Sequence, residues 1–147
     1  MADFDLLIIG TGSGNSILGE EHAHLRVGII ERSVFGGTCL NAGCIPSKRL
    51  VLPADRIVEA VEASERLGVR IEPSGVDWPA IRDRVFGRID PIAASGSRYR
   101  HSQEHVTVLH GNAVFAGERA VEVTYPDGSS ERVTADRIVL AAGASPR

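Results

Sequence analysis

One stretch near the start of the chain decides the fold, and it reads Asp5-Leu6-Leu7-Ile8-Ile9-Gly10-Thr11-Gly12-Ser13-Gly14-Asn15. The apolar run that ends at Ile9 has the continuous hydrophobicity of a parallel strand buried on both faces. The glycines after it predict a turn into a helix, since Gly10 permits a tight bend and Gly12 lets a pyrophosphate approach the main chain. Glycines alone are also compatible with a simple tight turn, so the interpretation depends on the residues around them.

Three residues complete this loop. Ser13 and Gly14 finish the candidate phosphate-binding turn. Asn15 stands where a third glycine or an alanine usually lets helix and strand pack closely. We therefore expect a looser or differently arranged contact at Asn15, for which Gly14 compensates.

The residues after the loop favour nucleotide binding. We expect a short helical segment over 16–24, and then residues 26–30 predict a second apolar strand that ends at Glu31. An acidic side chain at such a strand end, about 20 residues after the glycines, is where the ribose hydroxyls of a dinucleotide are accepted. Strand, glycine turn, helix, strand and acid therefore occur in the order of a dinucleotide-binding unit.

The chain has only two cysteines, Cys39 and Cys44, and they lie five positions apart in a glycine-rich stretch. Two thiols this close pair only if the backbone between them curls, which glycines permit. On the chain-entropy account, a disulfide that closes so short a loop stabilises a fold very little. Redox chemistry is therefore the favoured interpretation, and a purely structural pair is the alternative.

Composition narrows the class of protein. The chain has 147 residues with 43% hydrophobic and 24% charged content, which suits one globular domain with a core. A net charge of -3 without a basic run argues against a nucleic-acid partner. No stretch approaches the roughly 20 apolar residues of a membrane span, and acid near the N-terminus argues against a secretion signal. We expect a cytoplasmic protein, where a close cysteine pair is catalytic, redox-sensing or metal-binding.

The middle of the chain predicts two helices. The first covers residues 49–67 and ends at Gly68, and the second is capped by Asp77 and weakens or ends at Pro91. Apolar residues at helical spacing are expected to pack into the core, as are two aromatic residues. These positions are Leu50, Ile57, Val58, Val61 and Leu67 in the first helix, Ile81, Val85 and Ile89 in the second, and Trp78 and Phe86.

The last third of the chain changes to the period of strands. Residues 105–113 predict a strand running into a glycine turn, and residues 120–125 alternate. The turn at 126–128 predicts a hairpin whose second strand is 131–134, and 137–143 form one more apolar strand. The pattern predicts an α/β fold, with a Rossmann-like domain, a parallel central sheet and an inserted β-hairpin.

The cysteine segment carries a resemblance to a known family. Residues 36–48, following this opening, resemble the active-site segment of the flavin-dependent pyridine nucleotide-disulfide oxidoreductases, to which glutathione reductase and dihydrolipoamide dehydrogenase belong. Within the family, residues 10–17 and 86–93 resemble the mycothione reductases, and Asn15 fits that subgroup. The resemblance covers the whole chain, which corresponds to only the opening portion of such an enzyme.

The resemblance implies roles for particular residues. Cys44 would be the thiol nearer the flavin, and Cys39 the interchange thiol that attacks the substrate disulfide. Lys48 would lie near the flavin, and a helix start beside a cation favours a thiolate. A solvated helix residue is the alternative for Lys48. The other implied cofactor-binding positions are Gly10, Gly12, Ser13, Gly14, Glu31, Gly37, Thr38, Ala113 and Gly143.

The resemblance also implies what surrounds this segment. Residues 1–147 would be the N-terminal segment of an incomplete FAD-binding domain, with the NAD(P)-binding and dimerisation domains absent. NADPH or NADH would reduce FAD, and the cysteine pair would reduce a small disulfide, with mycothione as the favoured substrate. The complete form would be a homodimer, and this segment alone would be inactive. None of the five histidines matches the family's acid/base histidine, and their spacings indicate no metal site.

Other interpretations remain open. The chain could be a free-standing FAD-binding thiol redox protein, or another family member such as dihydrolipoamide dehydrogenase. A non-catalytic NAD-binding or metal-binding module is a third class, although two cysteines supply only two ligands. The end at 144–147, just after an apolar strand, favours a truncated enzyme over a free-standing protein.

Overall fold

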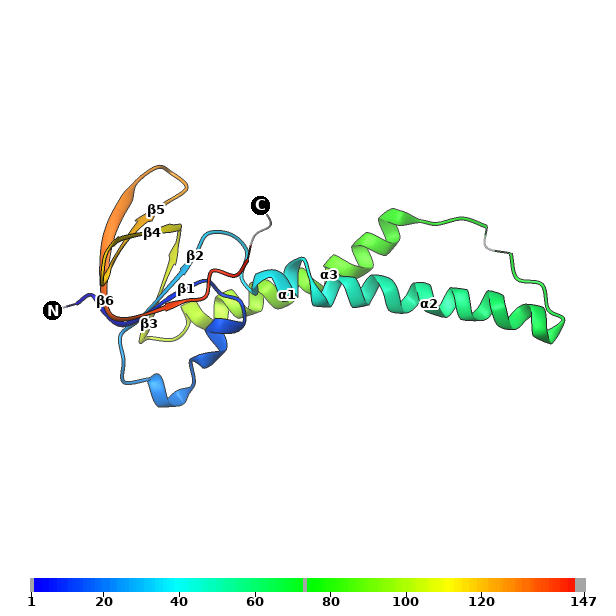
Figure 1. Ribbon diagram of the computed structural model, residues 1–147, viewed down its shortest axis with the longest axis horizontal. Helices are drawn as coiled ribbons and strands as arrows, with labels where there is room; N and C mark the ends of the chain where they lie inside the picture. The colour runs from blue at the N-terminus through cyan, green and yellow to red at the C-terminus, as the bar shows by residue number, and fades with distance from the viewer. Residues whose placement is uncertain (1, 73, 145–147) are drawn as a thin grey trace.

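The computed structural model describes residues 2–72 and 74–144, which form a six-stranded sheet in the order β3-β2-β1-β6-β5-β4 (Figure 1). β1 (Phe4–Ile9) pairs in parallel with β2 (Val27–Glu31) on one side and with β6 (Ser130–Leu140) on the other. β3 (Val106–His110) extends the parallel part beyond β2. The predicted α/β class with a parallel central sheet is confirmed.

The core lies on both faces of the parallel strands. Along β1, Leu6 and Ile8 enter one buried cluster while Leu7 and Ile9 enter the other, as the alternation of a strand requires. All five residues of β2 are buried. Burial on both faces explains why these strands read as uninterrupted apolar runs.

The helix expected over residues 16–24 is wrong. The chain instead forms two short 3₁₀ helices, η1 (Ser13–Ile17) and η2 (Glu20–His22). Leu18 between them has extended backbone angles and a buried side chain that joins a core cluster. Burial of Leu18, together with the poor helix propensity of the glycines that border this segment, outweighs continuation of the helix.

Two helices follow β2. α1 (Gly37–Asn41) is one short turn. α2 (Cys44–Leu67) begins at Cys44, so the predicted start at residue 49 is wrong. The early start is possible because Pro46 lies in the first turn, where a missing N–H leaves no hydrogen bond unmade. Gly68 ends α2 in the left-handed conformation, with φ of 65°, as expected.

α3 (Trp78–His101) confirms one expectation and corrects another. Asp77 caps its start, with Oδ1 accepting a hydrogen bond of 3.0 Å from the Ala80 N–H. The predicted weakening at Pro91 is wrong, because the helix continues to His101. α3 packs against β3, α1 and α2, and it has buried residues before and after the proline, which are Val85, Ile89 and Ala93.

α2 extends far beyond the sheet as an arm (Figure 1). Apolar residues of its predicted stripe are therefore exposed rather than buried, with Ile57 at 58% and Leu67 at 75% exposure. Val58, Trp78 and Phe86 are also exposed, so their predicted packing role is wrong among the described residues. Helical periodicity identified an apolar face, but the described part of the chain places no sheet beneath it.

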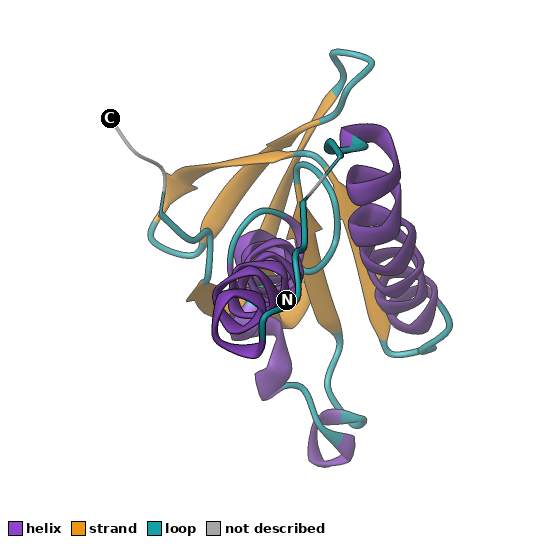
Figure 2. Cartoon of the chain, turned by 90° about the vertical axis from the view of Figure 1, so that its right-hand side faces the viewer, coloured by secondary structure: helices purple, strands orange, loops and turns teal. Residues whose placement is uncertain are grey.

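The predicted hairpin is confirmed as part of a three-stranded antiparallel unit of β4 (Asn112–Gly117), β5 (Ala120–Thr124) and β6. Figure 2 shows the strands behind the helices, viewed from the end of the arm. Residues 131–134 and 137–143 were expected as two strands, but they belong to one strand whose first half pairs with β5 and whose second half pairs with β1. That strand ends at Leu140.

No helix within the described residues combines the length and the apolar character that a membrane span requires.

Candidate dithiol and nucleotide site

The glycine loop packs tightly against the end of β6. Gly10 has φ of 107°, and a side chain there would collide with the main-chain oxygen of Ala141. A side chain at Gly14 would collide with the Cβ of the same alanine. In this loop Gly14 makes the close approach to the segment after β6, as expected. Asn15 therefore does not need to be a glycine or an alanine.

The glycine loop also contacts the start of α1. Gly37 has φ of 63°, and a Cβ on it would lie 2.6 Å from the Cα of Gly12. The loop and the first turn of α1 thus meet, although they are separated by 25 positions in sequence. Among residues 2–72 and 74–144, the main-chain N–H groups of Ser13, Gly14 and Thr38 have no hydrogen-bond partner. Free donors on two adjoining turns fit a diphosphate.

Glu31 lies at the end of β2 and is 8% exposed. Its Oε2 accepts hydrogen bonds from the Thr11 N–H at 3.0 Å and from the Thr11 hydroxyl. Its Oε1 accepts from the Ser33 N–H at 2.9 Å and from the Ser33 hydroxyl at 3.2 Å. The Thr11 hydroxyl also accepts from the Gly36 N–H at 3.2 Å, so one carboxylate links the glycine loop to the segment leading into α1.

Burial raises the pKa of the Glu31 carboxyl, but the hydrogen bonds from Thr11 and Ser33 outweigh burial and hold this pKa below its ordinary value. The four donors engage both carboxylate oxygens. A ribose hydroxyl can therefore bind Glu31 only by replacing or sharing one of the two side-chain hydroxyls. Sequence reasoning found Glu31 but missed Thr11 and Ser33, because a single hydroxyl residue has no spacing signature.

Cys39 and Cys44 come together at adjoining helix starts. Cys39 lies in α1 and Cys44 is the first residue of α2, and both are free, exposed thiols. The pKa of the Cys39 thiol is raised, first by the neighbouring Cys44 side chain and then by burial, while the Cys44 main chain and Lys48 oppose the rise. The effect of Cys44 on this pKa indicates that the two thiols lie near each other.

The remaining predicted residues come from three different parts of the chain. Lys48 is exposed on α2, one helical turn after Cys44. Ala113 lies half-buried in β4, just after Gly111, whose N–H donates to the main-chain oxygen of Glu31 at 3.0 Å. Gly143 follows β6 with φ of 74°. Ala113 is thus near the Glu31 end of the sheet.

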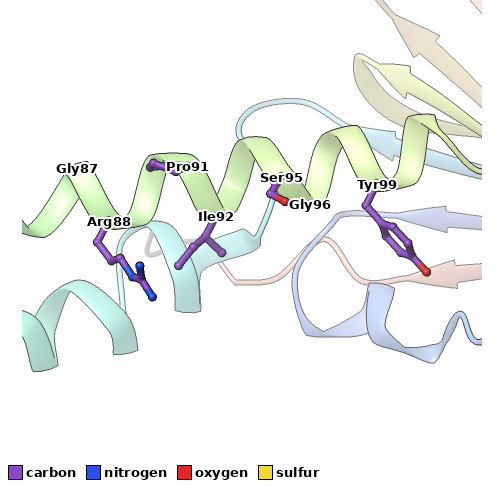
Figure 3. A pocket seen from close by; sticks show the side chains of 7 residues that line it. All are labelled: Gly87, Arg88, Pro91, Ile92, Ser95, Gly96 and Tyr99. Atoms are coloured by element: carbon purple, nitrogen blue, oxygen red, sulfur yellow. The ribbon is translucent and has the colours of Figure 1, made fainter.

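A groove of about 570 Å³ runs along α3 (Figure 3). It contains neither cysteine and none of the glycine-loop residues, so it is not the site of the dithiol. Its lining comes from one helix and consists of Gly87, Arg88, Pro91, Ile92, Ser95, Gly96 and Tyr99.

The histidines do not form a metal site in the part of the chain that the structure describes, where no group of three or more candidate ligands is found. His101 and His110 stack with ring centroids 5.4 Å apart, and Phe35 lies beside both. These contacts are aromatic packing.

Comparisons with known proteins agree with this geometry. The family model described as pyridine nucleotide-disulphide oxidoreductase matches residues 4–147. Mycothione reductase of Mycobacterium tuberculosis (strain ATCC 25618 / H37Rv) is 42% identical over 147 residues, which are 99% of this chain and 32% of that protein. Dihydrolipoyl dehydrogenase of Chlorobaculum tepidum is 33% identical over 148 residues, covering 99% of this chain and 31% of that protein.

Among solved structures, a Cu(II) complex of a mutant HOCl-induced flavoprotein disulfide reductase from Escherichia coli has a TM-score of 0.79 at 23% identity. The match covers 100% of this chain and 30% of that one, and it supports the fold alone. The chain spans about a third of the length of the curated relatives it matches. From the family match over 4–147, the chain belongs to the pyridine nucleotide-disulphide oxidoreductase family.

Proposed function

We propose that this chain is the N-terminal segment of the FAD-binding domain of a disulfide reductase. Electrons pass from NADPH or NADH through FAD to Cys39 and Cys44, and then to a low-molecular-weight disulfide. The observation that carries the proposal is that the two free thiols adjoin at helix starts, and that the first of these helices contacts the glycine loop. A structural cysteine pair would need no such loop beside it.

Several groups of this chain would hold the cofactor. The N–H groups of Ser13, Gly14 and Thr38 would donate to the diphosphate, and Gly12 and Gly37 let the two turns approach each other. Glu31 would accept the ribose, and Ala113 would lie near the adenine. When bound, FAD would carry electrons from a nicotinamide to a dithiol.

The dithiol chemistry follows the ordinary course of thiol–disulfide exchange. The Cys39 thiolate attacks one sulfur of the substrate disulfide, the substrate S–S bond breaks, and one substrate thiolate leaves. Cys44 then attacks the Cys39 sulfur, releases the second substrate thiol and leaves a Cys39–Cys44 disulfide. The substrate has gained two electrons and the pair has lost two, which the nicotinamide restores through FAD.

Proton transfer is needed before the first attack. The pKa of the Cys39 thiol is raised by Cys44 and by burial, so a base that accepts its proton would favour the attacking thiolate. Lys48 opposes the rise and so assists ionisation. In the family the base is a histidine of the C-terminal domain, which lies outside this chain.

Mycothione is the favoured substrate, because the 42% identity to a mycothione reductase exceeds the 33% identity to a dihydrolipoyl dehydrogenase. The second relative makes lipoamide, the disulfide form of the dihydrolipoyl group, the next candidate. A homodimer and a cytoplasmic location complete the proposal, since a dithiol that is recycled works in a reducing compartment.

The test is an anaerobic reductive titration of the complete protein that contains this segment. We expect bound FAD, and we expect the wild type to take up one electron pair more than Cys39→Ser or Cys44→Ser, because only the wild type has a disulfide to reduce. Turnover of mycothione in preference to lipoamide would support the favoured substrate. Equal electron uptake by all three proteins contradicts the redox dithiol.

A further inference from the structure

Arg100 is a buried cation that has no acidic partner among the described residues. It lies at the end of α3 with 7% exposure, and none of the ion pairs in that part of the chain includes it. Burying a guanidinium without a compensating charge is unfavourable. Burial also lowers the pKa of Arg100, although an arginine remains charged at neutral pH. Its position therefore needs an explanation beyond the packing of α3.

The guanidinium reaches the glycine loop from the other end of the chain. Nη2 of Arg100 donates to the main-chain oxygen of Asn15 at 2.9 Å, across 85 positions of sequence. Nη1 donates to Oε1 of Gln103 at 2.8 Å, and the guanidinium carbon lies 5.3 Å from the centre of the Tyr99 ring. The Asn15 N–H in turn donates to the main-chain oxygen of Gly12 at 3.0 Å. Arg100 therefore holds the peptide that closes the loop.

The local backbone explains why Asn15 needs this contact. In an α-helix its carbonyl would accept from the residue four positions later, but η1 ends at Ile17 and Leu18 is extended. The remaining main-chain donor to this carbonyl is the Leu18 N–H at 3.4 Å, a long bond. Within the described residues, Oδ1 of Asn15 is also buried without a partner. Arg100 thus replaces a helical hydrogen bond that this loop does not make.

We propose that Arg100 is a positioning residue for the diphosphate of the bound dinucleotide. It fixes the glycine loop through the Asn15 carbonyl, and its charge balances the diphosphate through the intervening loop without direct contact. Opposite charges that are partly shielded from water attract more strongly than in bulk solvent. This inference rests on the proposed binding of FAD, and it adds a residue outside the glycine loop to the binding machinery.

A charge role and a purely structural role predict different results for two variants. Arg100→Lys keeps the positive charge and one donor, whereas Arg100→Gln keeps a donor but removes the charge. Arg98→Gln is the matched control, because Arg98 is an exposed residue of the same helix with no ion pair among the described residues. Thermal unfolding of each apo-protein reports on the structural contribution separately.

The experiment measures dissociation constants for FAD and for ADP in the complete protein. We expect Arg100→Gln to weaken both by about fivefold to tenfold, because it removes a partly shielded positive charge and a donor to the Asn15 carbonyl. Arg100→Lys should recover most of the affinity, and Arg98→Gln should match the wild type. Equal weakening in the lysine and glutamine variants, or no weakening in either, overturns the proposal.

ADP separates this inference from the flavin function. If the wild type binds ADP but not FAD, and ADP binding falls in Arg100→Gln and recovers in Arg100→Lys, the role of Arg100 is supported and the flavin function is refuted. If the wild type binds neither ligand, both proposals fail.

Discussion

At the scale of single residues, the Glu31 carboxylate joins three parts of the site. It accepts from Thr11 in the glycine loop and from Ser33 after β2, and Thr11 passes the connection on to Gly36. Each contact to the carboxylate is a charge-assisted hydrogen bond, which is stronger than a bond between neutral groups. Removing the charge leaves buried donors without an equally strong acceptor.

The pKa of Glu31 predicts an acid-sensitive loop. Because the folded pKa lies below the ordinary value of 4.5, this stabilisation is fully present above that value and is lost as pH falls through the folded pKa. We expect FAD to dissociate more readily as pH falls below about 4.5. Glu31→Gln should weaken FAD binding at neutral pH and flatten this part of the pH profile. Glu118→Gln, at an exposed turn, should keep the wild-type profile, and an unchanged profile in Glu31→Gln would contradict the account.

Candidate site residues could be predicted where their spacing in the sequence is characteristic. Cys39, Cys44 and Glu31 could be proposed from the sequence because each stands at a characteristic interval from the glycines or from each other. Arg100 was missed because it reads as one more basic residue on a helix, and its contact with Asn15 depends on how distant segments pack.

At the scale of elements, the contact between the glycine loop and α1 brings the proposed nucleotide site and the proposed dithiol site together. The contact depends on a residue without a side chain at Gly37, because its φ of 63° is left-handed and a Cβ would press on Gly12. Gly96, in the middle of α3, has no atom within 4 Å of a Cβ position. The two glycines therefore form a matched pair for mutation.

Gly37→Ala should lower the free energy of unfolding by about 1–2 kcal/mol from the backbone strain alone, and should weaken FAD binding. Gly96→Ala should raise the free energy of unfolding by about 0.5–1 kcal/mol, since alanine is the better helix former. Urea unfolding of the complete protein and FAD titration measure both effects. Equal effects of the two substitutions would show that the loop and α1 do not depend on this contact.

Elements were predictable where local pattern and tertiary packing agree. Local pattern and tertiary packing agree in β1, in β2 and at the hairpin turn, so the sequence was enough to predict these elements. The 3₁₀ helices replaced the expected helix because Leu18 enters the core. α3 continues through Pro91 with buried residues on both sides of it, and it packs against β3, α1 and α2. In both places tertiary contacts overrode a local rule.

At the scale of the whole molecule, the sheet and the arm contribute differently. The buried clusters lie on the two faces of the sheet, whereas the apolar residues of α2, which extends beyond the sheet (Figure 1), are largely exposed. Sequence predicted both helices but not that one would project from the sheet, because amphipathic periodicity does not identify the surface that covers an apolar face. The dithiol lies at the base of this arm, where α1 and α2 begin.

Trapping of the mixed disulfide tests the central claim, which is that the two cysteines of the complete protein exchange with a small disulfide in unequal roles. Each single-serine variant is incubated with the small disulfide, and the masses of its cysteine-containing peptides are measured by mass spectrometry. Cys44→Ser should retain one half of the substrate on Cys39, since no second thiol remains to release it, and Cys39→Ser should retain none. Equal adducts in both variants, or no adduct in either, would contradict the account.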